Sequence, residues 1–262
     1  MQVELGSRQK ELQKHVSLDD IPSGARIPNH LFQILTPPAT IVDFGGGKGF
    51  KAHELRRIGY TVVVADINPE AITHALSFGL PALEVDITEI STVDSIRAFF
   101  SRNVDAVVME ALLCNLVGND WQKALRHAHE LLKEEGLLFI ADVLRVDQPN
   151  PLLDVNVDDT FLVWRRDWEE RYRNNTQLGL PWGTFVVARP GVNKSIEYGP
   201  PELLTHLVGT DNFERYALHL NEIELIDYCA SIGFEVILFE YMVWQSRENK
   251  PLSGCVLICQ KS

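Results

Sequence analysis

Residues 41–50 read Ile-Val-Asp-Phe-Gly-Gly-Gly-Lys-Gly-Phe, and residues 60–67 read Tyr-Thr-Val-Val-Val-Ala-Asp-Ile. An apolar strand thus runs into a glycine loop, a helix-length interval follows, and a second apolar strand ends in an acid, Asp66. Glycine has no Cβ, so such a loop can turn sharply and let a ligand approach the backbone. An acid at the end of the second strand can accept hydrogen bonds from ribose hydroxyls. The stretch predicts a nucleoside-cofactor site at the carboxyl edge of a parallel sheet.

The spacing of the glycines distinguishes two kinds of nucleoside site. A dinucleotide fingerprint, Gly-x-Gly-x-x-Gly, that began at Gly45 and Gly47 would need a glycine where the chain has Phe50. The glycines instead recur at every second position up to Gly49, and Asp43 stands two residues before the first of them. An NAD-type or other nucleoside-binding Rossmann domain stays open as the alternative.

This alternating pattern resembles motif I of the class I S-adenosylmethionine-dependent methyltransferases. Three later segments are similar to the ribose-binding corner, the adenine-binding corner and the fourth strand of that family: residues 66–72, Asp86-Ile87 and residues 104–110. The resemblance covers about residues 26–145, with a weaker similarity at 219–262. It implies an enzyme that uses S-adenosyl-L-methionine, releases S-adenosyl-L-homocysteine and transfers a methyl group.

The resemblance also implies which residues bind the cofactor: Arg26, Asp43, Gly45, Gly46, Gly47, Gly49, Asp66, Ile67, Asp86, Ile87 and Glu110. The glycine loop would admit the methionine arm, and Asp66 would accept from both ribose hydroxyls because a carboxylate has two acceptor oxygens. Asp86 would accept from the adenine amine while Ile87 packs on the ring. Asp43 would orient the loop or accept from the amino group of the cofactor. Glu110 would flank the methyl-transfer zone, and the arginine would reach the cofactor carboxylate.

Each of these roles has a plainer structural alternative. The glycines could form a tight turn without a ligand, and Asp66 could be an acid that stabilises a helix N-terminus through the macrodipole. Asp86 could be an ordinary loop acid, and Arg26 could simply be solvated.

A general base is needed only if the methyl acceptor keeps its proton at neutral pH. The candidates are His30, His206 and His219, although a histidine in a predicted helix is more often structural. We expect His127 and His129 at the surface of the helix before the fifth strand. The acidic residues Asp154, Asp158 and Asp159 could hold a cationic amine or a metal ion, but a solvated acidic loop is the favoured interpretation, and we predict no metal site.

Composition limits the class of protein. The chain has 262 residues and a formal net charge of −12, and an acidic surface repels phosphate backbones, so we expect no nucleic-acid partner. Its four cysteines form no Cys-x-x-Cys pair, and neither a signal peptide nor a run of about 18 apolar residues is found. These features predict a cytoplasmic protein without a membrane span, and they are compatible with a homodimer.

Strands and helices alternate along most of the chain, which predicts a parallel α/β sheet with right-handed crossovers. We predict strands near 40–44, 60–66, 82–86, 104–109, 137–143 and 254–260, and helices near 27–35, 50–58, 68–78, 92–101, 120–134 and 221–231. Residues 232–236 resemble the turn into a further strand, the sixth. Asn221 and Glu224 form a variant of the capping box. The family resemblance implies a Rossmann-like seven-stranded sheet in the order 3-2-1-4-5-7-6, with strand 7 antiparallel and helices on both faces.

The regular pattern breaks after the fifth strand. We predict an N-terminal arm over 1–25, a cofactor-binding core over 26–145 and 219–262, and an insertion or lid over 146–218. The insertion is rich in proline and aromatic residues, with a hairpin expected at 184–189 and 194–198 and a short helix at 201–208. In the family, insertions at this place frequently build the acceptor site.

We therefore expect methyl transfer to O or N of a small-molecule acceptor by in-line displacement. Two alternatives stay open: a non-catalytic cofactor-binding module that docks a partner protein, and a methyltransferase that acts on protein or tRNA.

Overall fold

The structure is a computed structural model that describes residues 29–116, 118–144, 184–188, 197–199, 213–218, 220–245 and 251–262. Seven strands form the main sheet, in the order β3 (Ala82–Glu84), β2 (Thr61–Asp66), β1 (Thr40–Phe44), β4 (Val104–Glu110), β5 (Leu132–Val143), β10 (Pro251–Lys261) and β9 (Phe234–Gln245). The first five of these strands run parallel to one another, and β10 is antiparallel to both β5 and β9. The Rossmann-like sheet with an antiparallel seventh strand is confirmed.

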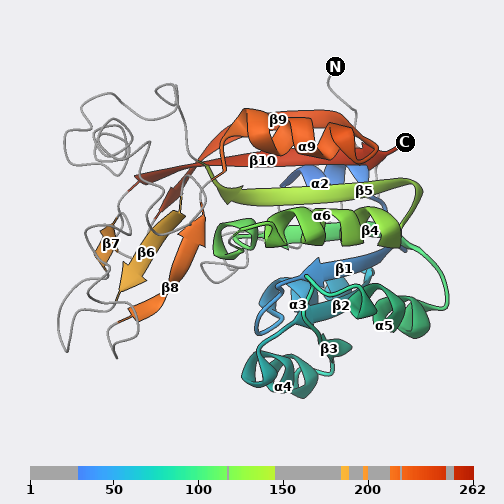
Figure 1. Ribbon diagram of the computed structural model, residues 1–262. Helices are drawn as coiled ribbons and strands as arrows, with labels where there is room; N and C mark the ends of the chain where they lie inside the picture. The colour runs from blue at the N-terminus through green and yellow to red at the C-terminus, as the bar shows by residue number, and fades with distance from the viewer. Residues whose placement is uncertain are drawn as a thin grey trace.

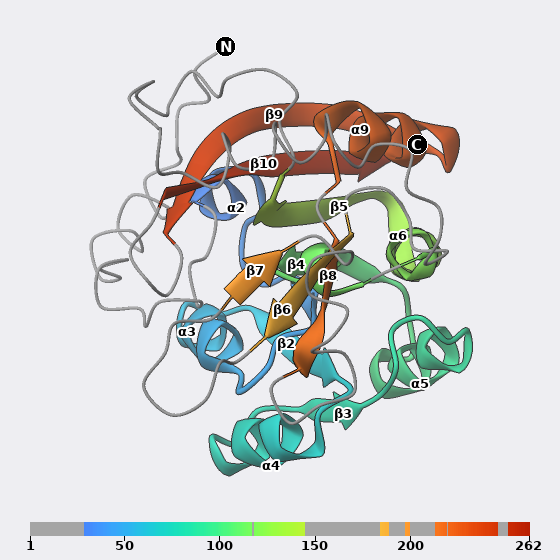
Figure 2. The same ribbon diagram turned by 60° about the vertical axis from the view of Figure 1, so that its left-hand side comes forward.

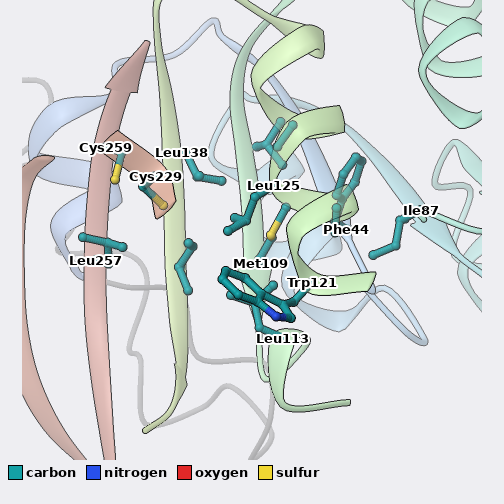
Figure 3. Packing of buried hydrophobic residues seen from close by; sticks show 14 of the residues in the cluster. Phe44, Ile87, Met109, Leu113, Trp121, Leu125, Leu138, Cys229, Leu257 and Cys259 are labelled. Carbon is teal, nitrogen blue, oxygen red and sulfur yellow. The ribbon is translucent and has the colours of Figure 1, made fainter. Parts of the chain in front are cut away.

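Helices cover both faces of this sheet and form two apolar clusters with it. One cluster packs residues of α5 (Ser91–Phe100), α6 (Asp120–Leu131) and α9 (Glu222–Ser231) on the sheet. The other packs α2 (Asn29–Ile34), α3 (Phe50–Arg57) and α4 (Pro69–Ser77) on the opposite face. Figure 2 shows the two groups of helices on either side of the sheet, and Figure 3 shows Met109, Trp121 and Leu125 packed together where α6 covers it.

Local sequence explains where two helices begin. The side chain of Asn68 accepts hydrogen bonds from the amides of Glu70 and Ala71, and Pro69 occupies the first turn, where its missing N–H costs nothing. Asn221 and Glu224 form the predicted capping box at the start of α9. None of the described helices is both long and apolar enough to cross a membrane.

The structure corrects two predicted boundaries. Helix α6 ends at Leu131 and β5 begins at Leu132, whereas we predicted a helix to 134 and a strand from 137. Leu132 is already extended (φ −68°, ψ 139°), and the left-handed backbone of Glu135 (φ 61°) coincides with a shift in the pairing of β5 with β4. The sequence interpretation placed the end of the helix at Gly136, but the chain leaves the helix before it.

A second, three-stranded sheet lies beyond the carboxyl ends of β1 and β5 (Figure 1). The predicted hairpin is confirmed as β6 (Thr184–Ala188) paired antiparallel with β7 (Glu197–Gly199). The strand β8 (Phe213–Leu218) pairs with the other edge of β6, and we did not predict it. The helix expected at 201–208 lies outside the described residues.

We predict that the same deletion of one methyl group has different effects at two positions of the main sheet. Ile258 of β10 is fully buried, whereas Ile237 of the edge strand β9 is 45% exposed. Ile258→Val should lower the free energy of unfolding in urea by about 0.5–1.5 kcal/mol because it leaves a cavity. Ile237→Val should change it by less than about 0.5 kcal/mol. Equal losses would contradict this assignment of the core.

Candidate functional site

Acidic side chains gather at the carboxyl edge of the main sheet. Asp66 and Glu110 are the last residues of β2 and β4, and Asp86 follows β3 by two residues. Asp43 and Asp142 lie one residue before the ends of β1 and β5. Because these strands are parallel, their carboxyl ends meet at one edge, which is where ligands bind in such sheets. The edge is therefore suited to a ligand that carries positive charge.

The glycine loop after β1 has a backbone that other residues would strain. Gly45, Gly47 and Gly49 have φ values of 64°, 54° and 80°. A Cβ on Gly45 would lie 2.6 Å from Cδ1 of Leu112, and a Cβ on Gly49 would lie 2.6 Å from Cδ1 of Leu80. A Cβ on Gly47 would meet no atom of the described residues within 4 Å. Packing therefore requires glycine at positions 45 and 49, whereas Gly47 has open space beside its backbone.

Asp66 ties the glycine loop to the end of β2. Its Oδ2 accepts a hydrogen bond from the amide of Gly47 at 2.8 Å, and its Oδ1 accepts one from the amide of Asn68 at 2.9 Å. Each carboxylate oxygen has a second lone pair, so Asp66 can still accept from a ligand. The next residue, Ile67, is 64% exposed and offers an apolar surface beside the carboxylate.

A buried lysine lies between two of the acids. Lys51 Nζ is 2.9 Å from Asp43 Oδ1 and 3.3 Å from Glu110 Oε2, and all three residues are buried. Burial raises the pKa of Asp43 above its ordinary value, and the ion pair with Lys51 opposes that shift. Burial alone would lower the pKa of Lys51, but the charges of Asp43 and Glu110 outweigh it and raise that pKa. The ammonium therefore keeps its proton.

Our sequence analysis missed Lys51, although a signal was present. The inward face of α3 carries Lys51, Ala52 and Leu55. Residues four apart lie on the same side of a helix, so the spacing of Lys51 and Leu55 places the lysine on the apolar face. A lysine there needs a carboxylate partner, since lysine is almost never fully buried unpaired.

Asp142 was also missed. Its Oδ2 accepts hydrogen bonds from the amides of Leu113 (2.7 Å) and Cys114 (3.3 Å), and its Oδ1 accepts one from the amide of Val143 (2.7 Å). Burial raises the pKa of Asp142, and these hydrogen bonds oppose the shift. Asp142 thus holds the short 3-10 helix η2 (Leu113–Asn115) against the end of β5.

The turn after β3 is held mainly by hydrogen bonds within the turn itself. Asp86 Oδ1 accepts hydrogen bonds from the amide of Thr88 (2.9 Å) and from its hydroxyl (2.7 Å). Ile87 is 6% exposed and belongs to the apolar cluster under α5 and α6. Its carbonyl accepts from Nδ1 of His127 at 2.8 Å. Our expectation of a surface His127 is wrong, because its spacing from Ala124 places it on the inner face of α6.

Several predicted site residues lie outside the described residues: Arg26, His206, His219, Asp154, Asp158 and Asp159. The backbone of His30 belongs to α2, but its side chain is not described. Within the described ranges, no group of His, Cys, Asp and Glu side chains is arranged to hold a metal ion.

Comparison with known families gives one match. A family model described as "Methyltransferase domain" matches residues 21–188, which is more than half of the chain. No match was found among curated protein sequences.

Solved structures of the same fold include an S-adenosylmethionine-dependent methyltransferase from Methanosarcina mazei. It has a TM-score of 0.64 at 21% identity, over 90% of this chain and 98% of that one. TehB from Haemophilus influenzae has a TM-score of 0.54 at 13% identity, over 90% of this chain and 63% of that one. The 1,6-didemethyltoxoflavin-N1-methyltransferase of Burkholderia thailandensis has a TM-score of 0.52 at 15% identity, over 97% of this chain and 82% of that one. At these identities the likeness is one of fold.

We predict that Gly49→Ala destabilises the protein more than Gly79→Ala. Both glycines have positive φ (80° and 70°), so each alanine costs about 1–2 kcal/mol in backbone strain. In the part of the chain that the structure describes, a Cβ at 79 meets nothing within 4 Å, whereas a Cβ at 49 crowds Leu80 and Ala75, which adds about 1–3 kcal/mol. Urea unfolding measures both losses. Equal losses would show that the loop is free to move away from α4.

Proposed function

Because this chain belongs to the methyltransferase-domain family and is an S-adenosylmethionine-dependent enzyme, we propose that it transfers a methyl group to O or N of a small-molecule acceptor. One observation carries the assignment of the cofactor site. The glycine loop is fixed by the hydrogen bond from the Gly47 amide to Asp66, and it leaves open space beside Gly47. The arrangement places an uncovered backbone next to a carboxylate that can accept hydrogen bonds from ribose hydroxyls.

The residues at the carboxyl edge fit S-adenosylmethionine. Asp43 Oδ2 is buried and has no hydrogen-bond partner in the part of the chain that the structure describes, so it can accept from the amino group of the cofactor. In the proposal the loop backbone receives the methionine arm, Asp66 binds the ribose hydroxyls and exposed Ile67 packs beside the nucleoside. Asp86 accepts from the adenine amine. When bound, the cofactor supplies a methyl group already activated on a sulfonium.

The protein itself has to align the acceptor and exclude water, which is catalysis by proximity. Glu110, at the end of β4, lies beside the methyl-transfer zone in this proposal. His30, His206 and His219 remain the proposed candidates for a base, and Arg26 the candidate for the cofactor carboxylate. A base is required only for an acceptor that is protonated at neutral pH.

The small sheet supports a small-molecule acceptor. Strand β8 contacts η2, which follows β4, so the sheet formed by β6, β7 and β8 stands next to the end of β4. The formal net charge of −12 disfavours a nucleic-acid acceptor. One protein of the same fold, the Burkholderia enzyme, was solved with bound 1,6-didemethyltoxoflavin, a small molecule. All four cysteines are free, in keeping with the cytoplasmic location that we propose.

The cofactor assignment predicts that S-adenosylhomocysteine binds the purified protein and that NADH does not. Asp66→Ala should weaken binding at least tenfold, because each lost hydrogen bond to a charged group is worth about 1.5–3 kcal/mol. Calorimetric titration measures both ligands. Asp94→Ala, which removes an exposed acid of α5, is the matched control and should bind like the wild type. Tight binding of NADH, or unchanged binding by Asp66→Ala, would overturn the assignment.

The acceptor assignment predicts that the label of methyl-labelled cofactor enters low-molecular-weight products. Purified protein is incubated with labelled cofactor and, separately, with a metabolite extract, a protein fraction and total tRNA. Label should appear in the metabolite fraction. Label confined to protein or tRNA would replace the small-molecule acceptor with a macromolecular one while leaving the cofactor assignment intact.

A further inference from the structure

The connection after β4, residues 111–116, contains a strained residue and a very short helix. Ala111 has a left-handed backbone (φ 50°), which is unfavourable for a residue with a Cβ. The helix η2 that follows has three residues, and 3-10 helices have poorer hydrogen-bond geometry than α-helices. The shape of this connection therefore depends on contacts with other elements.

Two neighbouring residues at the end of β5 provide these contacts. The amide of Ala111 donates to the carbonyl of Ala141 at 2.8 Å. The amides of Leu113 and Cys114 donate to Oδ2 of Asp142, at 2.7 Å and 3.3 Å. The single residue between Ala111 and Leu113 is therefore fixed from both sides.

That residue is Leu112, and its side chain lies against the glycine loop. A Cβ on Gly45 would be 2.6 Å from Cδ1 of Leu112, 3.3 Å from Cγ and 3.4 Å from Cδ2. Leu112 is partly buried and also packs against the apolar cluster under α5, α6 and α9. Through η2 the same connection contacts β8 of the small sheet. It thus joins the proposed cofactor loop to the sheet that supports the proposed acceptor.

We propose that Asp142 is a positioning residue for methyl transfer, which holds the connection after β4 so that Leu112 keeps the glycine loop in the shape that receives the methionine arm. This inference rests on the proposed function, since it concerns the loop of the proposed cofactor site. It goes beyond that function because neither Asp142 nor Leu112 is assigned there to the cofactor or the acceptor.

The carboxylate is needed because both of its oxygens accept hydrogen bonds. Oδ1 of Asp142 accepts from the amide of Val143 at 2.7 Å, while Oδ2 accepts from the two amides of the connection. Asparagine has the same shape but only one acceptor oxygen. In Asp142→Asn an NH2 group would face either the amide of Val143 or the amides of η2. Asp142 is 2% exposed, so water cannot replace the lost acceptor.

The experiment is a double-mutant cycle of Asp142→Asn and Leu112→Ala, in which calorimetric titration measures the affinity for S-adenosylhomocysteine. Asp142→Asn should bind about tenfold more weakly than the wild type, or worse. Because Asp142 acts through Leu112, it should weaken binding by less than about threefold when Leu112→Ala is already present. Equal losses in both backgrounds, or an unchanged affinity of Asp142→Asn, would overturn this role.

Asp105→Asn is the matched control, because Asp105 lies at the opposite end of β4 and also uses both oxygens. Its Oδ2 accepts from the amide (2.8 Å) and the hydroxyl (2.7 Å) of Thr40, and its Oδ1 is 2.6 Å from Nζ of Lys133. This substitution should lower the melting temperature and leave the affinity unchanged. A loss of affinity equal to that of Asp142→Asn would show that the ligand responds to the stability of the sheet in general, and would count against the proposal.

A second measurement covers the case in which Asp142→Asn does not fold. Coupling between two sites is reciprocal, so a ligand that needs the connection in place also stabilises it. Saturating S-adenosylhomocysteine should slow hydrogen exchange in the wild-type peptide that covers residues 111–116, by about threefold or more. Leu112→Ala should reduce this effect. Exchange that does not respond to the ligand, or that responds equally in Leu112→Ala, would overturn the proposal.

The two proposals fail in different ways. A wild type that binds no S-adenosylhomocysteine overturns the proposed cofactor site and this inference with it. A wild type that binds it, while Asp142→Asn keeps the same affinity, overturns the role of Asp142 alone. A lower melting temperature of Asp142→Asn with unchanged affinity would show that the carboxylate serves only the fold.

Discussion

The ion pair of Lys51 with Asp43 is the interaction on which the site depends. Asp43 is fully buried on β1, and a buried carboxylate needs a compensating cation. The lysine that provides it belongs to the first turn of α3, so the ion pair fixes both ends of the glycine loop, which is the whole connection between the strand and the helix. Through Glu110 the same ammonium also fixes the end of β4. The strand β4, which is distant in sequence, is thus held at the same point as β1 and α3.

The glycine loop shows how packing and ligand access are combined. Gly45 and Gly49 let the loop lie against Leu112 and Leu80, two leucines from different connections. Gly46 admits the carboxylate of Asp43, because a Cβ there would lie 2.7 Å from Oδ2. The neighbouring Gly47 faces open space and donates its amide to Asp66. The loop therefore packs against the core at Gly45, Gly46 and Gly49. It stays uncovered at Gly47, whose amide is bonded to Asp66, the residue that we propose to bind the ribose.

Local patterns were sufficient to predict most of the helices and strands, but not their order in the sheet. The strand order followed from the family resemblance, and the capping box at Asn221 followed from residues within one turn. What the sequence did not reveal depends on contacts between distant segments. Strand β8 exists because it pairs with β6, Asp142 holds η2 across a separation of 29 residues, and His127 turns inward to the carbonyl of Ile87. For β8 and Asp142 the partner lies far away in the sequence, outside the window in which periodicity is assessed. For His127 the inner face of α6 was visible in its spacing from Ala124, but the partner carbonyl was not.

Two leucines mark where the chain leaves the main sheet and where it returns. Leu144 follows β5 and Leu218 ends β8, and both are buried in the same apolar cluster, at 1% and 3% exposure. The segment between them is thus anchored at both ends in the core of the main sheet. If this segment carries the acceptor site, as we propose, recombination between related genes that exchanged it as a unit would bring a different acceptor to the same cofactor site. The two leucines would be the natural crossover points for chimaeric enzymes.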